Sequence, residues 1–338
     1  MTGPTTRLAR PDEDDVVRGV LAAAFPDNPK ARADVLRWQY RQCPYGEART
    51  WVVEDEGEVI AVYTGVPVAV VVEGRPATAA LGIDAAVLPA HQGRRLFTPL
   101  SRALYDDLGA QGWVYVLAYP SLASRRGIAR AGWVEVARLR VNVLPVDDAW
   151  VQERFRVPAL ASAALRGTAF RTARRGGSEV DGPPAGLDAL WERTRPANGL
   201  VRDEAWFRWR YAAAPDPSAY RWFEVREQGR LAAVAVTTQK QAFGGTFTYV
   251  LEHTADSVRS ARALTAALAR GAQGTAGLAR LARGGSRADR LARAGGFRRL
   301  PRRLEPHPQW FGAVPTTPSS PDPAGLAWTV AWGDLDHL

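Results

Sequence analysis

The spacing of apolar residues predicts helices followed by strands in the first part of the chain. After the acidic run Asp12–Asp15, apolar side chains recur at helical spacing from Val16 to Phe25, and a second helical stretch covers about residues 30–40. Strand-like segments follow at residues 50–54, 59–72 and 77–88, separated by glycine-containing turns. With a short strand-like piece at residues 7–10, this pattern predicts a strand, two helices and a three-stranded meander.

Helix and strand patterns alternate beyond Pro89. Leu96, Leu100, Leu104 and Leu108 fall on one face of a predicted helix. A strand is expected at residues 113–119, a short helix at 124–130 and a strand at 133–144. The predicted order up to residue 144 is β-αα-βββ-α-β-α-β.

The second half of the chain repeats the pattern of the first half. At an offset of 171 residues, Leu36–Tyr40 is matched by Phe207–Tyr211, Pro44 by Pro215 and Trp51 by Trp222. A repeat of this length indicates a duplicated domain rather than a solenoid. We expect an N-terminal domain at residues 1–145, a connection at 146–185 and a C-terminal domain at 186–338.

Two proline-containing segments are read as connections between these regions. The first, residues 146–185, is expected to contain one helix within residues 157–175, with Arg171, Arg174 and Arg175 near its C-terminal end. The second, residues 314–323, is read as a linker to a last strand and turn at residues 328–334.

Composition narrows the class of protein. The 338 residues are 46% hydrophobic, enough for buried cores. One cysteine, Cys43, and four scattered histidines give no metal-ligand spacing, so no metal site is expected. No stretch is long and apolar enough to span a membrane, and the N-terminus shows no export signal, so we expect a cytoplasmic protein.

The net charge of +9 is concentrated in one segment. Residues 259–303 contain 12 arginines and one acid, Asp289, and the rest of the chain is close to neutral. Such a segment could contact the phosphates of a nucleic acid, but we interpret it as a solvated helical face.

The sequence around residues 87–97 predicts an anion site. A strand ending near Pro89 passes through a turn with Gly93 into a helix, so the unpaired N–H groups at the helix start face outward. Arg94 and Arg95 add donors suited to phosphate oxygens. An ordinary turn with two surface arginines is the alternative.

The element order and this turn resemble the GNAT superfamily of acyl-CoA-dependent N-acyltransferases. The matching segments are Val87-Leu88-Pro89, Gln92-Gly93-Arg94, Leu96-Phe97 with Leu100, Tyr119-Pro120-Ser121 and Gly132-Trp133. The resemblance implies an α/β fold of the α+β type: two GNAT-like domains, each with a mixed, mainly antiparallel central sheet flanked by helices. It covers about residues 7–144, and the second half only through the repeat.

The resemblance also implies the residues that hold acetyl-CoA. Val87 and Leu88 would face the acyl-pantetheine arm, and Gln92, Gly93, Arg94, Arg95 and Leu96 would face the pyrophosphate. Ser121 and Ser124 lie where the family often places polar contacts to the cofactor arm, although helix capping also explains a serine there.

Some positions depart from the family pattern. Ala90 and Arg95 replace two of its three key turn positions, and Ile128 replaces its frequent tyrosine acid. We expect Asp84 to act as the base or to orient the ammonium group, with a salt-bridged strand acid as the alternative. Tyr119 is the nearest hydroxyl that could protonate the leaving thiolate, with a core tyrosine as the alternative.

The second copy lacks the glycine-containing turn, so we expect it to bind no nucleotide cofactor. The resulting hypothesis is an N-acyltransferase, dependent on acetyl-CoA, that acts on a primary amine of a small molecule, sugar or peptide. The alternatives are a non-catalytic acyl-CoA-binding relative, an aminoacyl-tRNA-dependent peptidyl transferase of similar duplicated fold, and a nucleic-acid-binding protein. A monomer and a homodimer are both compatible with the sequence.

Overall fold

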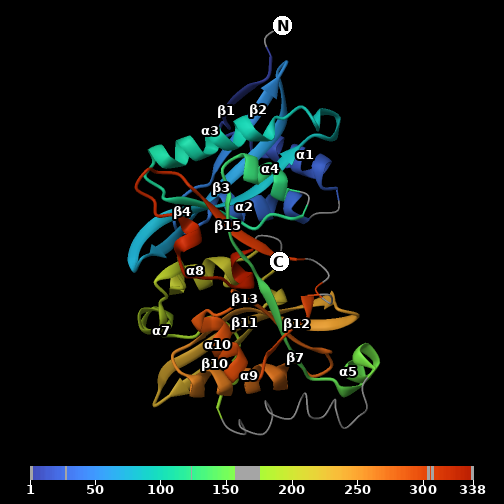
Figure 1. Cartoon of the computed structure of the whole chain (residues 1–338), viewed down its shortest axis with the longest axis vertical. Coiled ribbons are helices and arrows are strands. Elements are labelled where there is room, and N and C mark those ends of the chain that lie inside the picture. The colour runs from blue at the N-terminus through green and yellow to red at the C-terminus, as the bar shows by residue number, and fades with distance from the viewer. Residues whose placement is uncertain are drawn as a thin grey trace. The chain divides into compact units, whose positions relative to one another are not determined.

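Figure 1 shows the computed structural model of the chain, which describes residues 3–26, 29–122, 124–156, 176–302, 305 and 308–335. The chain divides into two compact units. Unit 1 consists of Met1–Ala137, Ala213–Pro215 and Gln309–Leu326, and unit 2 of Arg138–Ala212, Asp216–Pro308 and Ala327–Leu338. The helix expected within residues 157–175, with Arg171, Arg174 and Arg175, lies outside the described residues.

Unit 1 follows the predicted element order closely. Its elements are β1 (Thr5–Leu8), α1 (Asp14–Ala24), α2 (Ala33–Arg41), β2 (Arg49–Asp55), β3 (Glu58–Val72), β4 (Arg75–Val87), α3 (Phe97–Ala110), β5 (Tyr115–Ala118), α4 (Arg125–Arg130), β6 (Val134–Arg138) and β15 (Trp310–Pro315). The strand order is β1-β2-β3-β4-β5-β15-β6. Glu56-Gly57 and Glu73-Gly74 all have positive φ, the geometry of tight two-residue hairpin turns, and they close the meander.

Unit 2 repeats this architecture. Its elements are β7 (Arg140–Pro145), α5 (Asp148–Phe155), β8 (Ser178–Val180), α7 (Leu187–Thr194), β9 (Asn198–Leu200), α8 (Glu204–Phe207), β10 (Arg221–Glu227), β11 (Arg230–Ala242), β12 (Gly245–Ala255), α9 (Val258–Gly271), β13 (Gly277–Ala282), α10 (Arg287–Ala294), β14 (Arg298–Arg299) and β16 (Trp328–Thr329). The strand order is β14-β7-β13-β12-β11-β10-β8. Both units thus have the expected mixed, mainly antiparallel sheet flanked by helices.

Each sheet contains a strand from the opposite half of the sequence. The strand expected at residues 133–144 is divided at Leu139, and its second part, β7, lies between β13 and β14. In return β15 lies between β5 and β6, where Figure 1 shows it in red among blue and green strands. A Cβ on Gly312 of β15 would lie 2.2 Å from the Val134 carbonyl oxygen, so only glycine allows this close approach.

This exchange changes the expected boundaries. The sequence pattern assigned residues 309–326 to the C-terminal domain and partly to a linker. They belong to unit 1, because β15 pairs with β5 from Gly312↔Ala118 to Pro315↔Tyr115. Arg138 to Pro145, assigned to the N-terminal domain, belong to unit 2, because β7 pairs with β13. The last strand and turn expected at residues 328–334 are present as the two-residue β16 and a 3₁₀ turn at Trp332–Asp334.

The core of unit 1 lies under α3. Leu96, Leu100, Leu104 and Leu108 are all buried against the sheet, which confirms the predicted apolar face. The core of unit 2 lies in the same way under α9, where Leu264 and Leu268 meet the strands. These two clusters hold α3, which follows β4, and α9, which follows β12, against their sheets.

Local irregularities recur at matching places in the two units. The β2–β3 register shifts between Val53 and Glu54, and the β10–β11 register shifts between Val225 and Arg226. A second pair of shifts lies in the β3–β4 and β11–β12 ladders. Beside these bulges, Tyr40 donates to Asp84 of β4, and Tyr211, 171 residues later, donates to Glu252 of β12. The structural matches fall where the sequence repeats.

A buried ion-pair network surrounds Glu252 in unit 2. Arg202 Nε donates to Glu252 Oε2 over 2.8 Å, and the same guanidinium pairs with Asp334. Tyr211 and Trp206 donate to Glu252 Oε1 over 2.9 and 3.2 Å. Burial raises the pKa of Glu252, so its negative charge depends on these partners.

Replacing Arg202 by methionine should therefore destabilise the protein strongly. Arg202→Met leaves two buried carboxylates without their cation, and we expect a loss of about 3–5 kcal/mol in the free energy of unfolding. Urea denaturation measures this loss. Arg208→Met, which removes an exposed arginine paired with Glu204, is the control and should cost under about 1 kcal/mol. Equal losses in the two variants would contradict the network's structural role.

Candidate functional site

The candidate site of unit 1 begins where β4 separates from β5. These parallel strands pair only at Ala80↔Val116 and Leu81↔Leu117, although β4 continues to Val87. Asp84 has a φ of 54° and lies at the bulge in the β3–β4 ladder. Among the described residues, the end of β4 therefore has a strand partner on one edge alone.

The backbone N–H and C=O groups of Val87 point away from β3, the remaining strand partner of β4. The Leu88 N–H donates to the Ile60 carbonyl of β3 over 2.9 Å, and hydrogen bonding to one neighbour alternates along an antiparallel strand. The polar groups of Val87 therefore lie on the opposite edge, where its carbonyl accepts from Gln92 Nε2 over 3.3 Å. Both backbone polar groups of Leu88 are engaged, since its carbonyl accepts from the His91 N–H.

The turn after β4 leads into α3, whose N-terminus has no side-chain cap. Gly93 has a φ of 81° and Arg95 a φ of 59°, so two left-handed residues turn the chain into α3. Leu96 occupies the N-cap position and supplies no side-chain acceptor to the first N–H groups of α3. These donors and the helix dipole favour an anion.

The two arginines of the turn differ in their surroundings. Arg94 donates to Asp55 Oδ2 over 2.8 Å and lies 2.7 Å from Nδ1 of His91, so its guanidinium holds the turn to β2. Arg95 is exposed and makes no ion pair with the described residues. Arg95 is therefore the arginine that remains available to a ligand, and His91 acts as a partner of Arg94.

Asp84 is buried and held by side chains that the sequence pattern did not single out. Its Oδ2 accepts from the Tyr40 hydroxyl over 2.7 Å, and its Oδ1 lies 3.7 Å from Nζ of Lys30. Thr64 Oγ1 in turn donates to the Tyr40 oxygen over 3.1 Å. The only signal in the sequence was the recurrence of Tyr40 as Tyr211, which can equally reflect core packing.

The remaining candidates lie beyond β5. Tyr119 is half-buried, and its ring centroid lies 5.2 Å from that of Phe311 in β15. The Ser121 and Ser124 hydroxyls lie 3.1 Å apart, and Ser121 Oγ accepts from the Ser124 N–H before α4. Their present bonds are those of a local turn. Ile128, at the family's tyrosine position, is buried in the core.

The corresponding helix end in unit 2 is closed. Ser257 Oγ accepts from the Ser260 N–H, and Ser260 Oγ accepts from the Ser257 N–H, so the first turn of α9 is capped by its own side chains. Asp256 also places a carboxylate beside Ser260. An external anion has no vacant donors there comparable to those of α3.

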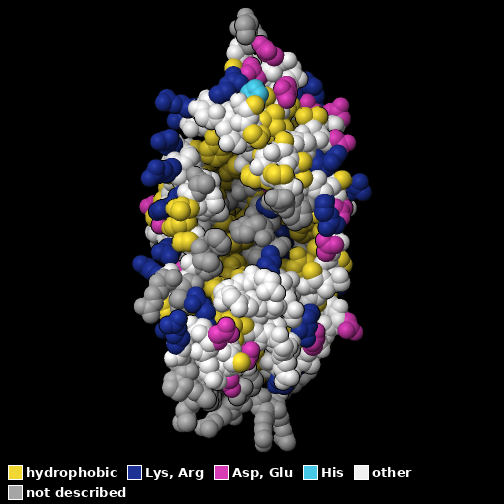
Figure 2. Space-filling model, turned by 90° about the vertical axis from the view of Figure 1, so that its right-hand side faces the viewer, with side chains coloured by type: hydrophobic (Ala, Val, Ile, Leu, Met, Phe, Trp, Pro, Cys, Tyr) yellow, Lys and Arg dark blue, Asp and Glu magenta, His cyan; other side chains and the backbone are white. Residues whose placement is uncertain are grey.

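The arginine-rich segment does not form one solvated helical face. It spans α9, β13, α10 and β14, and Arg280 of β13 is only 3% exposed. All residues of β13 are buried, so both faces of this strand, including the one that carries Arg280, are covered. Figure 2 shows basic and acidic side chains interspersed on the face that it draws, rather than one continuous basic surface.

Other expectations concern cysteine, metals and membranes. Cys43 is buried, and burial raises the pKa of its thiol to about 11, so it behaves as a small hydrophobic residue. No cluster of metal-ligating side chains occurs among the described residues. In the same part of the chain, no helix is long and apolar enough to cross a membrane.

Comparison with known proteins gives one matching family model. Residues 5–135 match the family model described as the acetyltransferase (GNAT) domain. A search of curated protein sequences gives no significant match.

Solved structures share the fold over nearly the whole chain. A probable N-acyltransferase from Enterococcus faecalis is 12% identical, with a TM-score of 0.67, covering 92% of this chain and 72% of its own. A GCN5-related N-acetyltransferase from Kribbella flavida is 17% identical, with a TM-score of 0.62 and coverage of 92% and 71%. The N-myristoyltransferase of Saccharomyces cerevisiae with bound myristoyl-CoA is 11% identical, with a TM-score of 0.58 and coverage of 96% and 87%.

Proposed function

Because residues 5–135 match the family model of the acetyltransferase (GNAT) domain, we propose that unit 1 binds acetyl-CoA and transfers its acetyl group to a primary amine. The acceptor is a small molecule, a sugar or a peptide that reaches the thioester while acetyl-CoA is bound. The repeated bulges and tyrosine–carboxylate pairs support an origin of the two units by duplication, of which only unit 1 retains the nucleotide-binding turn.

The observation that carries the proposal is the uncapped start of α3 directly after the separated end of β4. The first N–H groups of α3 would bind the pyrophosphate together with Arg95, whose guanidinium is available. Gly93, with open space around its Cα, lets the backbone come close to the phosphates. The acyl-pantetheine arm would then follow the free edge of β4.

The reaction requires few groups. The amine nitrogen attacks the thioester carbonyl carbon, and the oxygen of the tetrahedral intermediate takes the negative charge. The Val87 N–H, on the free edge of β4, would donate to that oxygen. The C–S bond then breaks, the amide forms, and the thiolate leaves and accepts a proton, for which Tyr119 is the proposed donor.

Asp84 is proposed to take the proton from the attacking amine. Its place at the β4 bulge puts it three residues before Val87 on the same strand, and Tyr40 and Lys30 fix its orientation. A carboxylate held in this way would orient an ammonium group of the substrate. Asp84 thus both orients the amine and accepts its proton.

Acetyl-CoA binding should depend on the turn. Calorimetric titration should give micromolar affinity, and Gly93→Glu should abolish it, because the new carboxylate would repel the pyrophosphate. Gly112→Glu is the matched control, since Gly112 also has positive φ and open surroundings but lies at the other end of α3. Arg95→Gln should weaken binding roughly tenfold. An unchanged affinity in Gly93→Glu, or no binding by the unmodified protein, would refute this placement.

Turnover should depend on Asp84. Over a panel of primary amines, release of the CoA thiol by Asp84→Asn should have a kcat lower by about 10²–10⁴-fold, with little change in KM for acetyl-CoA. Tyr40→Phe should lower kcat less, because it leaves the carboxylate in place. Asp106→Asn, at an exposed carboxyl on α3, is the control and should be neutral. Acetyl-CoA binding without turnover of any amine would favour a non-catalytic relative instead.

A further inference from the structure

Unit 2 contains a cavity of about 570 Å³ that the proposed acyl transfer in unit 1 does not use. β12 pairs with β13 only from Phe247↔Gly277 to Val250↔Arg280, and the cavity begins where these two strands separate. It is lined by the end of β12, from Glu252 to Ala255, and by the segment from Arg283 to Leu291 that leads into α10. Its volume is typical of a site for a small molecule.

The cavity is strongly basic. Arginines 195, 202, 280, 283, 287 and 290 line it, and Glu252 is the single acid among its described lining residues. Glu252 is already paired with Arg202. Arg195 pairs with Glu192, so the guanidinium groups of Arg280, Arg287 and Arg290 are the ones that give the cavity its positive charge.

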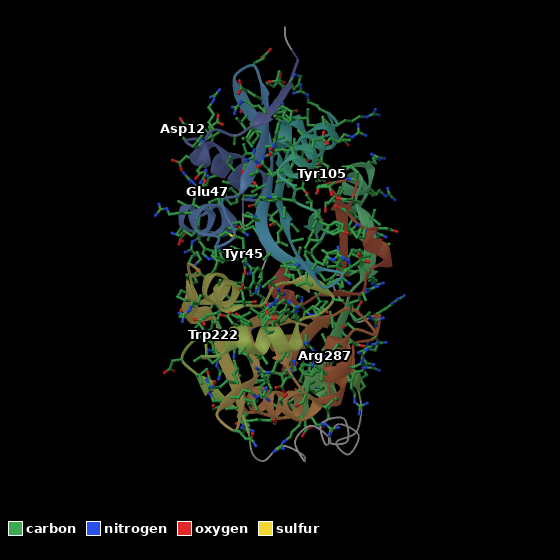
Figure 3. The ribbon with its side chains drawn as sticks, turned by 90° about the vertical axis from the view of Figure 1, so that its left-hand side faces the viewer. Asp12, Tyr45, Glu47, Tyr105, Trp222 and Arg287 are labelled. Carbon is green, nitrogen blue, oxygen red and sulfur yellow. The ribbon has the colours of Figure 1, made fainter. Side chains whose placement is uncertain are left out.

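Several of these arginines are held by backbone carbonyls rather than by acids. Arg280 Nη1 donates to the Ala288 carbonyl over 2.7 Å, and Arg290 Nη1 donates to the Gly285 carbonyl over 2.8 Å. Arg287, labelled in Figure 3, donates to the Asp256 carbonyl over 3.0 Å. Among the described residues none of these three forms an ion pair, so their side chains are oriented without being neutralised.

Arg280 and His253 are deeply buried polar residues that line the cavity. Arg280 is 3% exposed and His253 is 7% exposed. Neither ring nitrogen of His253 has a hydrogen-bond partner among the described residues. Burial lowers the pKa of Arg280 to about 10 and lowers the pKa of His253 well below its usual value, with the nearby Arg280 adding to the effect.

A buried guanidinium without a direct ion pair and a buried imidazole whose nitrogens lack a hydrogen-bond partner among the described residues are both costly in a folded protein. An anion that accepts hydrogen bonds would remove both costs at once. Beside these groups the cavity has apolar walls, formed by Trp191, Leu200, Trp328 and Val330.

We propose that this cavity is a binding site for a small organic anion, distinct from the acyl-CoA site. Its carboxylate or phosphate group lies against Arg280 and His253, and its apolar body lies against Trp191 and Trp328. The start of α9 is capped by its own side chains, which favours a compact oxyanion at Arg280 over a nucleotide diphosphate. The proposal concerns unit 2 alone and does not depend on acyl transfer in unit 1.

The test uses the full chain and two probes, inorganic phosphate and benzoate, which separate the charged group from the apolar body. Binding is followed by the midpoint of thermal unfolding and by tryptophan fluorescence, because two indoles line the cavity. Arg280→Met keeps the length of the side chain and removes its charge. Arg259→Met is the control, since Arg259 lies on α9 with its side chain 88% exposed.

We expect at least one probe, at millimolar concentration, to raise the unfolding midpoint and change the fluorescence. Arg280→Met should weaken that probe tenfold or more and should not lower the midpoint of the free protein, while Arg259→Met should behave as the unmodified chain. Should Arg280→Met fail to fold, His253→Phe, which keeps the ring and removes its nitrogens, should show the same loss.

Gly93→Glu separates this site from the turn of unit 1. The response to the probes should survive in Gly93→Glu, which disrupts only the acyl-CoA turn. No response to either probe would overturn the proposal, as would an equal response in Arg280→Met. A response that is lost in Gly93→Glu would also overturn it, because the anion would then bind in unit 1.

Discussion

The separation of two parallel strands at the end of β4 is the constraint on which the candidate active site depends. A β-strand inside a sheet has both edges occupied, but β4 loses β5 after Leu81 and keeps only β3. Its backbone donors there must be satisfied by something other than sheet. The bulge at Asp84 turns a carboxylate toward Tyr40 at this point, and the chain then passes through the turn at residues 88–96 into α3. A thioester carbonyl and a pyrophosphate match the donors that this geometry leaves.

In unit 2 the parallel strands β12 and β13 also separate, but the side chains around the separation differ from those in unit 1. Ser257 and Ser260 cap α9, and Glu252 is neutralised by Arg202. The positive charge lies instead on Arg280 and on the segment leading into α10. One scaffold thus offers an uncapped helix end in one unit and a buried guanidinium in the other, which suit different anions.

Much of the fold follows from local sequence. The periodicity of α3, the meander and the repeat of Tyr40 as Tyr211 were predicted because each depends on spacing within a short window. The exchange of β7 and β15 was not predicted, because β15 is flanked by prolines and its partner β5 lies about 195 residues earlier in the chain. The anion site at the Gly93 turn was predicted from a local motif, and it stays a prediction. The partners of Asp84, Arg94 and Arg280 were not, since each is a contact between residues distant in sequence.

The most direct test of the central claim is amide hydrogen exchange of the full chain with and without acetyl-CoA. The account predicts that acetyl-CoA slows exchange in two segments of unit 1, residues 82–88 at the free edge of β4 and residues 92–100 at the start of α3. Exchange around the cavity of unit 2, at residues 280–291, should stay unchanged. Slowed exchange confined to the unit 2 segment, or no change anywhere, would contradict the assignment of the acyl-CoA site to unit 1.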